Sequence, residues 1–485
     1  MNRRNLRYHQ ADLPEHRGNP LIEALPAIKG DDEVLKKLIN VPVCKAQERD
    51  LPPQLRKMLV QRILELIQPI PEYLTYFRAI ENAIFSGYST KNPFSPTTAH
   101  YLHYLDSDET PVQPVTGRFQ PCGSATTIIG DSGLGKSVML NNVLNYFPQV
   151  LEHKQYHGRK LNLKQIVWVR MDCPHDASIS GFCIAAFQAI EDLLGVKIVE
   201  DAFRGRPSVE KMQNVLERLI RTSFIGLIAI DEFSNIHINK SGGLNKLLKW
   251  LLNLMNRSGV PFVFSGTWEM ADILTKQLRI ARRSEAGGTI IMDVLPPEVW
   301  DIFVKRLWRL QWTNPPTKLS QELYNRLARI ADGSIDTAVK VFMKAQQLVI
   351  GSGDERITSS VLDSAFRLSC PLTQAARRII QTDNNALKNI ELNFDSGMEL
   401  DSEIGEKEVL MNLKDQADKN LVPGDLTRVQ HPEFRQNILS LRTDESMLNK
   451  INNSDIVRSA AGKDNPLSYF KDAGLLLEQP LIISP

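Results

Sequence analysis

The chain has 485 residues, of which 42% are hydrophobic and 24% are charged, the balance of an ordinary soluble globular protein. The formal net charge is only +2, so any contact with nucleic acid depends on a local basic patch and not on overall charge. Five cysteines without a CxxC pair argue against a disulfide framework or a structural zinc site, and no run of about 18 apolar residues occurs, so we expect neither a secreted nor a membrane-spanning protein.

The chain begins with an irregular segment that leads into a helical one. Residues 1–55 are polar and proline-rich, with one apolar cluster, LIEALP, at 21–26, and they predict a flexible arm that becomes ordered on another surface. A helical pattern follows over residues 53–87 and is interrupted by Pro69 and Pro71, because proline cannot donate the helical hydrogen bond.

From Ala125 onward, short β-rich segments alternate with helical ones, which predicts an α/β fold with a doubly wound parallel sheet. The expected strands are residues 126–130, 165–172, 226–231, 260–266 and 288–295. After Pro297 only helical periodicity remains, and after Pro371 the sequence becomes acidic and less regular. We therefore expect four parts: an arm (1–55), an α/β domain with a helical lead-in (56–296), a helical lid (297–370) and a tail (371–485).

The stretch GDSGLGKS at residues 130–137 matches the phosphate-binding pattern GxxxxGK[ST]. Its glycines allow backbone N–H groups to surround an anion, Lys136 reaches the β- and γ-phosphates, and Ser137 ligates magnesium. A flexible strand-to-helix turn is the alternative interpretation. The residues expected to contact nucleotide are Gly130, Asp131, Ser132, Gly133, Leu134, Gly135, Lys136, Ser137 and Val138.

A second motif supports nucleotide binding. The sequence LIAIDEF places Asp231 and Glu232 directly after an apolar strand. We expect Asp231 to orient the water shell of Mg²⁺ and Glu232 to polarise the attacking water. A helix N-cap would explain this pair if it stood alone, but together with the phosphate loop it predicts an ATPase that uses ATP and Mg²⁺.

Hydrolysis also needs groups that sense the γ-phosphate and neutralise charge. The strand VPFVFSGT ends in Ser265 and Thr267, of which Thr267 is the better candidate to hold the attacking water. Strand termination is the alternative role for both hydroxyls. The segment QLRIARRSEAGG supplies Arg279, Arg282 and Arg283, and an arginine here could enter a neighbouring subunit's site as an arginine finger. Its alternative is a solvated basic helix end.

Together these motifs resemble the AAA+ ATPases, and specifically the TnsC/TniB regulators of bacterial transposons. Four further stretches resemble TnsC proteins that work with TnsA and TnsB: HRGNPLIEALP, FSGYSTKNP, QLRIARRSE and ADGSIDTAVKVFMKAQ. The resemblance spans residues 14–370. One departure concerns the lid, where a GxxR-type turn is replaced by Gly333–Asp336, so that Lys340 is a weak substitute for the usual arginine.

The resemblance implies an ATP-dependent matchmaker in the bacterial cytoplasm, without membrane contact. Such proteins assemble on double-stranded DNA as a ring or helical homo-oligomer, hexameric or heptameric. A TniQ/TnsD-type selector, or a CRISPR effector carrying one, chooses the target, and the assembly then recruits and activates the TnsA endonuclease and TnsB transposase. The arm would face the selector and the tail the transposase, unless both ends are passive.

Two other classes remain as alternatives. One is a processive motor or loader, such as a helicase loader or a protein unfoldase. An unfoldase would need an aromatic-hydrophobic pore loop, for which Phe203 is a candidate. The neighbouring cations suit phosphate contact better, and the expected DNA-binding residues are His175, Lys197, Arg204 and Arg206. A non-catalytic signalling NTPase is disfavoured by Glu232.

Overall fold

The computed structural model describes residues 6–69, 71–95, 98, 123–174, 176, 178–197, 203, 207–233, 241–275 and 286–371. The chain divides into two compact units, residues 1–424 and 425–485, and all described residues belong to the first. Within the described residues, no helix is both long and apolar enough to cross a lipid bilayer.

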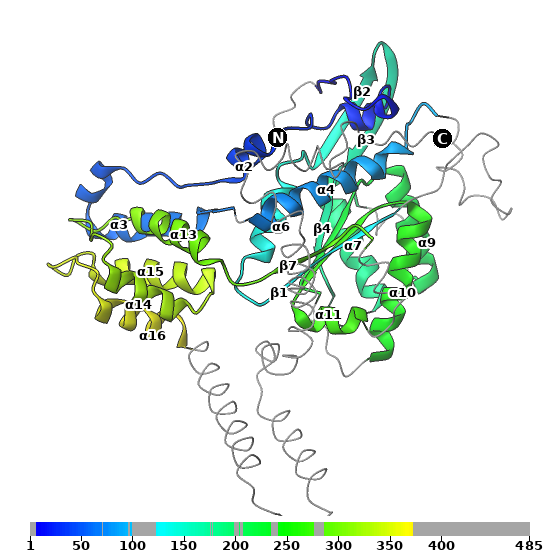
Figure 1. Cartoon of the computed structure of the whole chain (residues 1–485). Coiled ribbons are helices and arrows are strands. Elements are labelled where there is room, and N and C mark those ends of the chain that lie inside the picture. Colours follow the sequence, from blue (N-terminus) through cyan, green and yellow to red (C-terminus); the bar gives the residue numbers. More distant parts are fainter. Residues whose placement is uncertain are drawn as a thin grey trace, which may run out of the picture. The chain divides into compact units, whose positions relative to one another are not determined.

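A five-stranded parallel sheet in the order β4–β5–β6–β1–β7 forms the centre of the α/β domain (Figure 1). Every residue of β1, β5 and β6 is buried, which explains why these strands appear in the sequence as continuous apolar runs. The fold confirms the predicted parallel sheet. The strands are β1 (Ala125–Gly130), β4 (Val169–Asp172), β5 (Ile228–Asp231), β6 (Phe262–Gly266) and β7 (Thr289–Met292).

Helices cover the sheet. Helix α4 packs with α6 and contacts β7, whereas α7, α9 and α10 pack with one another and α11 contacts β1 and β6. Because the strands are parallel and each is followed by a connecting segment, the carboxyl ends of β1, β5 and β6 lie at one edge. The helices are α4 (Pro71–Ser89), α6 (Lys136–Leu144), α7 (Ile179–Leu194), α9 (Val209–Thr222), α10 (Ser241–Ser258) and α11 (Trp268–Thr275).

The segment 165–172, expected to be one strand, belongs to two sheets. Residues 165–166 end β3 (Arg159–Ile166), which pairs antiparallel with β2 (Val150–Tyr156), and β4 begins only at Val169. Between them, Val167 donates its N–H to the Gln149 carbonyl (2.9 Å). The apolar run continues through this junction because both sides of it are buried, so no polar residue marks the break.

The N-terminal segment does not extend away as an arm over residues 6–25 but packs on the chain itself. The Tyr156 hydroxyl donates to Glu23 (2.6 Å), Gln165 donates to the Leu21 carbonyl (2.9 Å), and the Leu21 side chain is fully buried. In Figure 1 the darkest-blue helical turns lie beside the β2–β3 hairpin. The apolar cluster therefore finds its surface within the same molecule. The elements of this segment are η1 (Pro14–His16), α1 (Pro20–Glu23) and α2 (Asp31–Leu38).

Two segments that are distant in the sequence, residues 16–20 and 85–93, contact each other. Asn19, from HRGNP, donates to the Tyr88 carbonyl, and Asn92, from STKNP, donates to the Gly18 carbonyl, each at 2.9 Å. The Tyr88 hydroxyl in turn donates to the Ile166 (3.1 Å) and Phe224 (2.9 Å) carbonyls. These stretches therefore fasten the N-terminal segment to the α/β domain.

The lid is helical, as expected. Ser320, Ser334 and Thr358 each accept a backbone N–H at the start of a lid helix, which explains where those helices begin. The lid helices are α13 (Pro297–Arg309), α14 (Gln321–Ala331), α15 (Ile335–Val349) and α16 (Ser359–Ser369).

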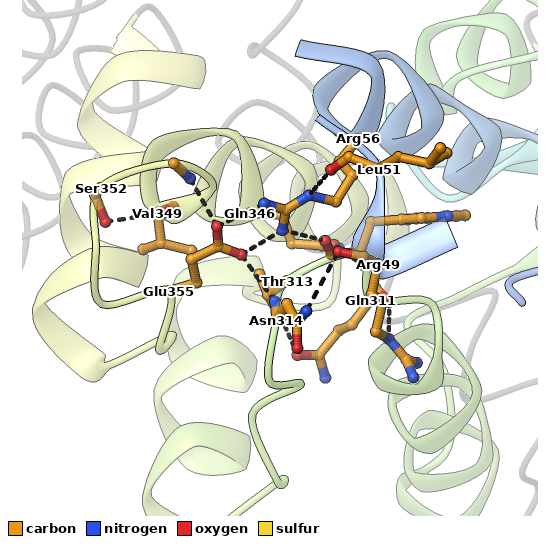
Figure 2. A network of polar contacts seen from close by, with 12 residues as sticks. Arg49, Leu51, Arg56, Gln311, Thr313, Asn314, Gln346, Val349, Ser352 and Glu355 are labelled. Atoms are coloured by element: carbon orange, nitrogen blue, oxygen red, sulfur yellow. Dashed lines mark hydrogen bonds and ion pairs between the residues drawn. The ribbon is translucent and has the colours of Figure 1, made fainter. Parts of the chain in front are cut away.

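A separate part of the N-terminal region contacts the lid. This part comprises η2 (Ala46–Asp50), α3 (Pro53–Leu59) and η3 (Val60–Glu65), of which η3 packs on α15. Figure 2 shows Arg56 at the centre of a polar network: it donates to the Trp312 carbonyl (3.0 Å) and pairs with Glu355. Residues N-terminal to the sheet are thus joined to residues C-terminal to it.

Candidate nucleotide-binding site

The phosphate loop has the backbone that the sequence predicts. Gly133 (φ +81°) and Gly135 (φ +92°) adopt left-handed conformations that other residues rarely adopt, and α6 begins directly afterwards at Lys136. A Cβ atom on Gly130 would come within 2.5 Å of the Met292 carbonyl oxygen, so β1 and β7 require glycine there. The strand–loop–helix order places the N-terminus of α6 at the carboxyl edge of the sheet, which favours an anion.

Lys136 folds back over this loop. Its Nζ donates to the carbonyls of Gly130 and Asp131, each at 2.8 Å. Burial, opposed in part by the Asp131 and Asp231 carboxylates, lowers the pKa of Lys136 to about 8. A phosphate would offer this cation a stronger partner than two carbonyls, because charge-assisted hydrogen bonds are the stronger kind.

Asp231 ends β5 and is almost fully buried. Its Oδ1 accepts the backbone N–H of Glu232 (3.0 Å), and its Oδ2 accepts a hydrogen bond from Arg170 (2.8 Å). Burial raises the pKa of the Asp231 carboxyl, but hydrogen bonds from Arg170 and the Ser137 hydroxyl outweigh this effect and hold the pKa below its usual value. Asp231 is therefore a carboxylate at neutral pH.

The donor set suits magnesium. The Ser137 hydroxyl helps to lower the pKa of the Asp231 carboxyl, which brings two candidate oxygen ligands from separate motifs close to each other. Mg²⁺ prefers such oxygen ligands and usually keeps several waters in its shell. Bound there, the ion would neutralise phosphate charge; Ser137 and Asp231 would hold and orient it.

Glu232 is exposed and has a left-handed backbone (φ +53°). A non-glycine residue in this conformation stores strain, and such residues concentrate at functional sites. The neighbouring Asp231 compensates by accepting the Glu232 N–H. This turn follows Asp231 at the end of β5, where the sequence predicts a water-polarising glutamate.

The two hydroxyls at the end of β6 lie in different surroundings. Ser265 is buried and close enough to lower the pKa of Asp231, although its Oγ forms no hydrogen bond within the described residues. Thr267 donates instead to Glu269 at the start of α11 (3.1 Å). Of the two, Ser265 is the one that the structure brings to Asp231.

The lid contacts the phosphate loop through the start of α15. The Asp336 N–H donates to the Gly133 carbonyl (3.3 Å), and a Cβ on Gly133 would come within 2.7 Å of the Ser334 Oγ. Lys340, the substitute for the arginine of the GxxR turn, pairs with Asp336 (2.6 Å) at the surface.

Several expected site residues lie outside the described part of the chain: Arg279, Arg282, Arg283, His175, Arg204 and Arg206. Lys197 is described and follows the end of α7 at Gly195. The Phe203 ring lies 5.7 Å from that of Phe187, which is buried in α7. This aromatic side chain is thus packed against the α/β domain.

Arg170 was not among the residues expected at the site, although it contacts Asp231. Its signal was present in the motif VRMD: alternate residues of a strand share a face, so Arg170 and Asp172 point to the same side of β4. The sequence did not reveal that β4 pairs with β5, and this pairing brings Arg170 to Asp231.

The five-stranded parallel sheet and its phosphate loop define the AAA+ P-loop NTPase fold. Residues 123–274 match the sequence family described as AAA domain, which covers the described site from β1 to α11.

Solved structures with similarity include the Aeropyrum pernix ORC1 protein in complex with DNA (18% identity, TM-score 0.35, covering 71% of this chain and 82% of that one). Cdc6p from Pyrobaculum aerophilum is similar at 12% identity (TM-score 0.34, covering 55% and 71%). The Thermotoga maritima RuvB Holliday junction branch migration motor is similar at 12% identity (TM-score 0.30, covering 50% and 61%). A comparison with curated proteins found no match.

Proposed function

We propose that this protein is an ATP-dependent regulator of DNA transposition. It would hydrolyse ATP at the site formed by Lys136, Ser137, Asp231 and Glu232, and assemble as a ring or helical oligomer on double-stranded target DNA. Hydrolysis would reset the assembly. The observation that carries the ATPase part is the phosphate loop, in which Gly133 and Gly135 adopt left-handed conformations directly before α6, together with the buried Asp231 at the end of β5. The transposition part rests on the resemblance of residues 14–370 to TnsC proteins.

The contact between two of the resembling stretches supports this proposal. Because Asn19 and Asn92 each bond to the other stretch, the stretches form one structural unit in the folded chain. His175, Lys197, Arg204 and Arg206 remain our candidates for sequence-independent phosphate contacts, and Arg279, Arg282 and Arg283 for the finger that makes hydrolysis depend on assembly.

Within this function, the protein would link a TniQ/TnsD-type selector, alone or within a CRISPR-associated complex, to TnsA and TnsB. We assign the transposase contact to the tail, residues 371–485. The selector contact of the arm cannot be tested by the same kind of deletion. Residues 6–25 pack on the α/β domain, and their deletion would remove part of the core. Any selector contact must therefore use the outer surface of this segment.

The test is capture of purified TnsA and TnsB on immobilised duplex DNA that carries the ATP-loaded protein. We expect the full chain to retain both subunits and a chain ending at residue 371 to lose them while still binding DNA. Full capture by the shortened chain would overturn the tail assignment. Failure of the full chain to retain either subunit would favour a DNA-remodelling or helicase-loader ATPase.

A further inference from the structure

Arg170 forms a bridge between two carboxylates at the edge of the candidate site. Its guanidinium lies 2.8 Å from the Asp231 Oδ2 and 3.4 Å from the Asp172 Oδ1. The Asp231 side chain is 2% exposed and that of Asp172 is 62% exposed. Arg170 thus has two carboxylate partners. The buried one, Asp231, belongs to the candidate nucleotide site, and the solvent-accessible one, Asp172, does not.

The sheet fixes this arrangement. Strands β4 and β5 pair in parallel with Arg170 opposite Ala229 and Asp172 opposite Asp231. Paired residues of neighbouring strands point to the same face, and so do alternate residues of one strand. Arg170, Asp172 and Asp231 therefore share one face of the sheet at its carboxyl edge, and a rotation of the arginine side chain is enough to favour either carboxylate.

Both carboxylate oxygens of Asp231 accept hydrogen bonds from the protein. Oδ1 accepts the Glu232 N–H, and Oδ2 accepts Arg170. A hydrated Mg²⁺ shell held by Asp231 needs the same acceptor sites, and two cations at one carboxylate oxygen repel each other. The Arg170 Nε is buried and forms no hydrogen bond within the described residues, so this side chain is incompletely paired in the present conformation.

We propose that Arg170 is a positioning residue that holds the Asp231 carboxylate until magnesium nucleotide binds, and that it then releases Asp231 and pairs with Asp172. This inference rests on the proposed nucleotide site. It makes Arg170 a competitor of Mg²⁺ and Asp172 the acceptor that relieves the competition. By linkage, whatever strengthens the Arg170–Asp231 pair weakens magnesium binding at this site.

The test measures binding and requires no hydrolysis. A fluorescent ADP analogue is bound to the full chain, and Mg²⁺ is titrated to find its half-saturating concentration. Arg170→Gln is expected to lower this concentration by about tenfold, within the usual range of coupling between two ligands. Asp172→Asn is expected to raise it, because Arg170 then has Asp231 as its remaining carboxylate partner in the bridge.

A double-mutant cycle separates this exchange from a general effect of charge. If Asp172 acts through Arg170, Asp172→Asn has no effect in the Arg170→Gln background, whereas independent charge effects would add. Arg326→Gln, which removes an arginine paired with Asp363 in the lid, is the control and should leave the half-saturation unchanged.

Two results would overturn the inference: additive effects in the cycle, or an unchanged or raised magnesium requirement in Arg170→Gln. Asp172→Asn alters an exposed carboxylate, so it tests the exchange even if Arg170→Gln folds poorly. A wild-type chain that binds no nucleotide would overturn the proposed function, and the inference with it. That outcome differs from one in which the wild type binds nucleotide normally but the half-saturating Mg²⁺ concentration does not change in the variants.

Discussion

Arg56 and Glu355 are 299 residues apart in the sequence and form a two-pronged ion pair (Figure 2). The Arg56 Nη2 donates to the Glu355 Oε1 at 2.8 Å, and the side chains are only 7% and 9% exposed. Glu355 also accepts the backbone N–H groups of Gly351 (2.9 Å) and Asn314 (2.8 Å). The pair joins α3 to the lid and leaves neither charge unsatisfied.

Removing one partner of this pair should lower the free energy of unfolding substantially. Arg56→Ala leaves the Glu355 carboxylate buried without its cation, and the loss of one partner from a buried pair costs about 3–5 kcal/mol. We expect the free energy of unfolding of the lid to fall by an amount of this order. Urea denaturation followed by tryptophan fluorescence checks it, because Trp308 and Trp312 lie in the lid core.

A matched control lies next to Glu355. Arg356 pairs with Asp354 (2.8 Å), but both side chains are well exposed. Arg356→Ala should therefore leave the denaturation midpoint unchanged, since exposed ion pairs contribute little. Equal losses in the two variants would contradict the structural role given to Arg56.

The stability of the α/β domain should depend on pH through Lys91. Its Nζ donates to the Gly259 carbonyl (3.1 Å) beyond the end of α10, and burial lowers the pKa of Lys91 from 10.5 to about 7. Between these values the unfolded chain holds a proton that the folded chain has lost. The free energy of unfolding should therefore rise with pH from about 7 to about 10.5, by at most about 1.4 kcal/mol per unit.

Denaturation of wild type and Lys91→Met across this pH range measures the effect. The difference in slope between the two proteins isolates Lys91, and the exposed Lys305→Met variant should keep the wild-type slope. Parallel curves for wild type and Lys91→Met would show that Lys91 keeps its proton on folding.

Substitution of Glu232 should separate ATP binding from hydrolysis. Glu232→Gln keeps the shape of the side chain but cannot accept a proton from water, so we expect turnover to fall by about 100-fold or more while ATP still binds. Lys136→Ala should abolish binding itself. Phosphate release and fluorescent-nucleotide binding distinguish the two, and exposed Glu298→Gln is the control. Undiminished turnover in Glu232→Gln would remove Glu232 from the role of base.

The sequence was sufficient to predict what depends on local pattern. The glycines of the phosphate loop and the apolar runs of β1, β5 and β6 each determine structure within a few residues. The position of β4 was less predictable, because a buried junction separates it from β3 without any change in polarity.

Contacts between distant segments could not be predicted from local pattern. Leu21 belongs to a short apolar cluster in a polar region, which is also the composition of a segment that folds on a partner. Its burial depends on the β2–β3 hairpin, whose Gln165 bonds to the Leu21 carbonyl. Arg170 reaches Asp231 only because β4 and β5 are neighbours in the sheet.

We propose that the nucleotide site controls assembly of the protein on DNA. The most direct measurement is the mass of the protein bound to a duplex of arbitrary sequence at low salt, with ATP and Mg²⁺, for wild type, Lys136→Ala and Glu232→Gln. We predict large assemblies for wild type and Glu232→Gln that dissociate steeply as salt increases, and none for Lys136→Ala. Wild type that remains monomeric on DNA with ATP, or Lys136→Ala that assembles as wild type does, would contradict the account.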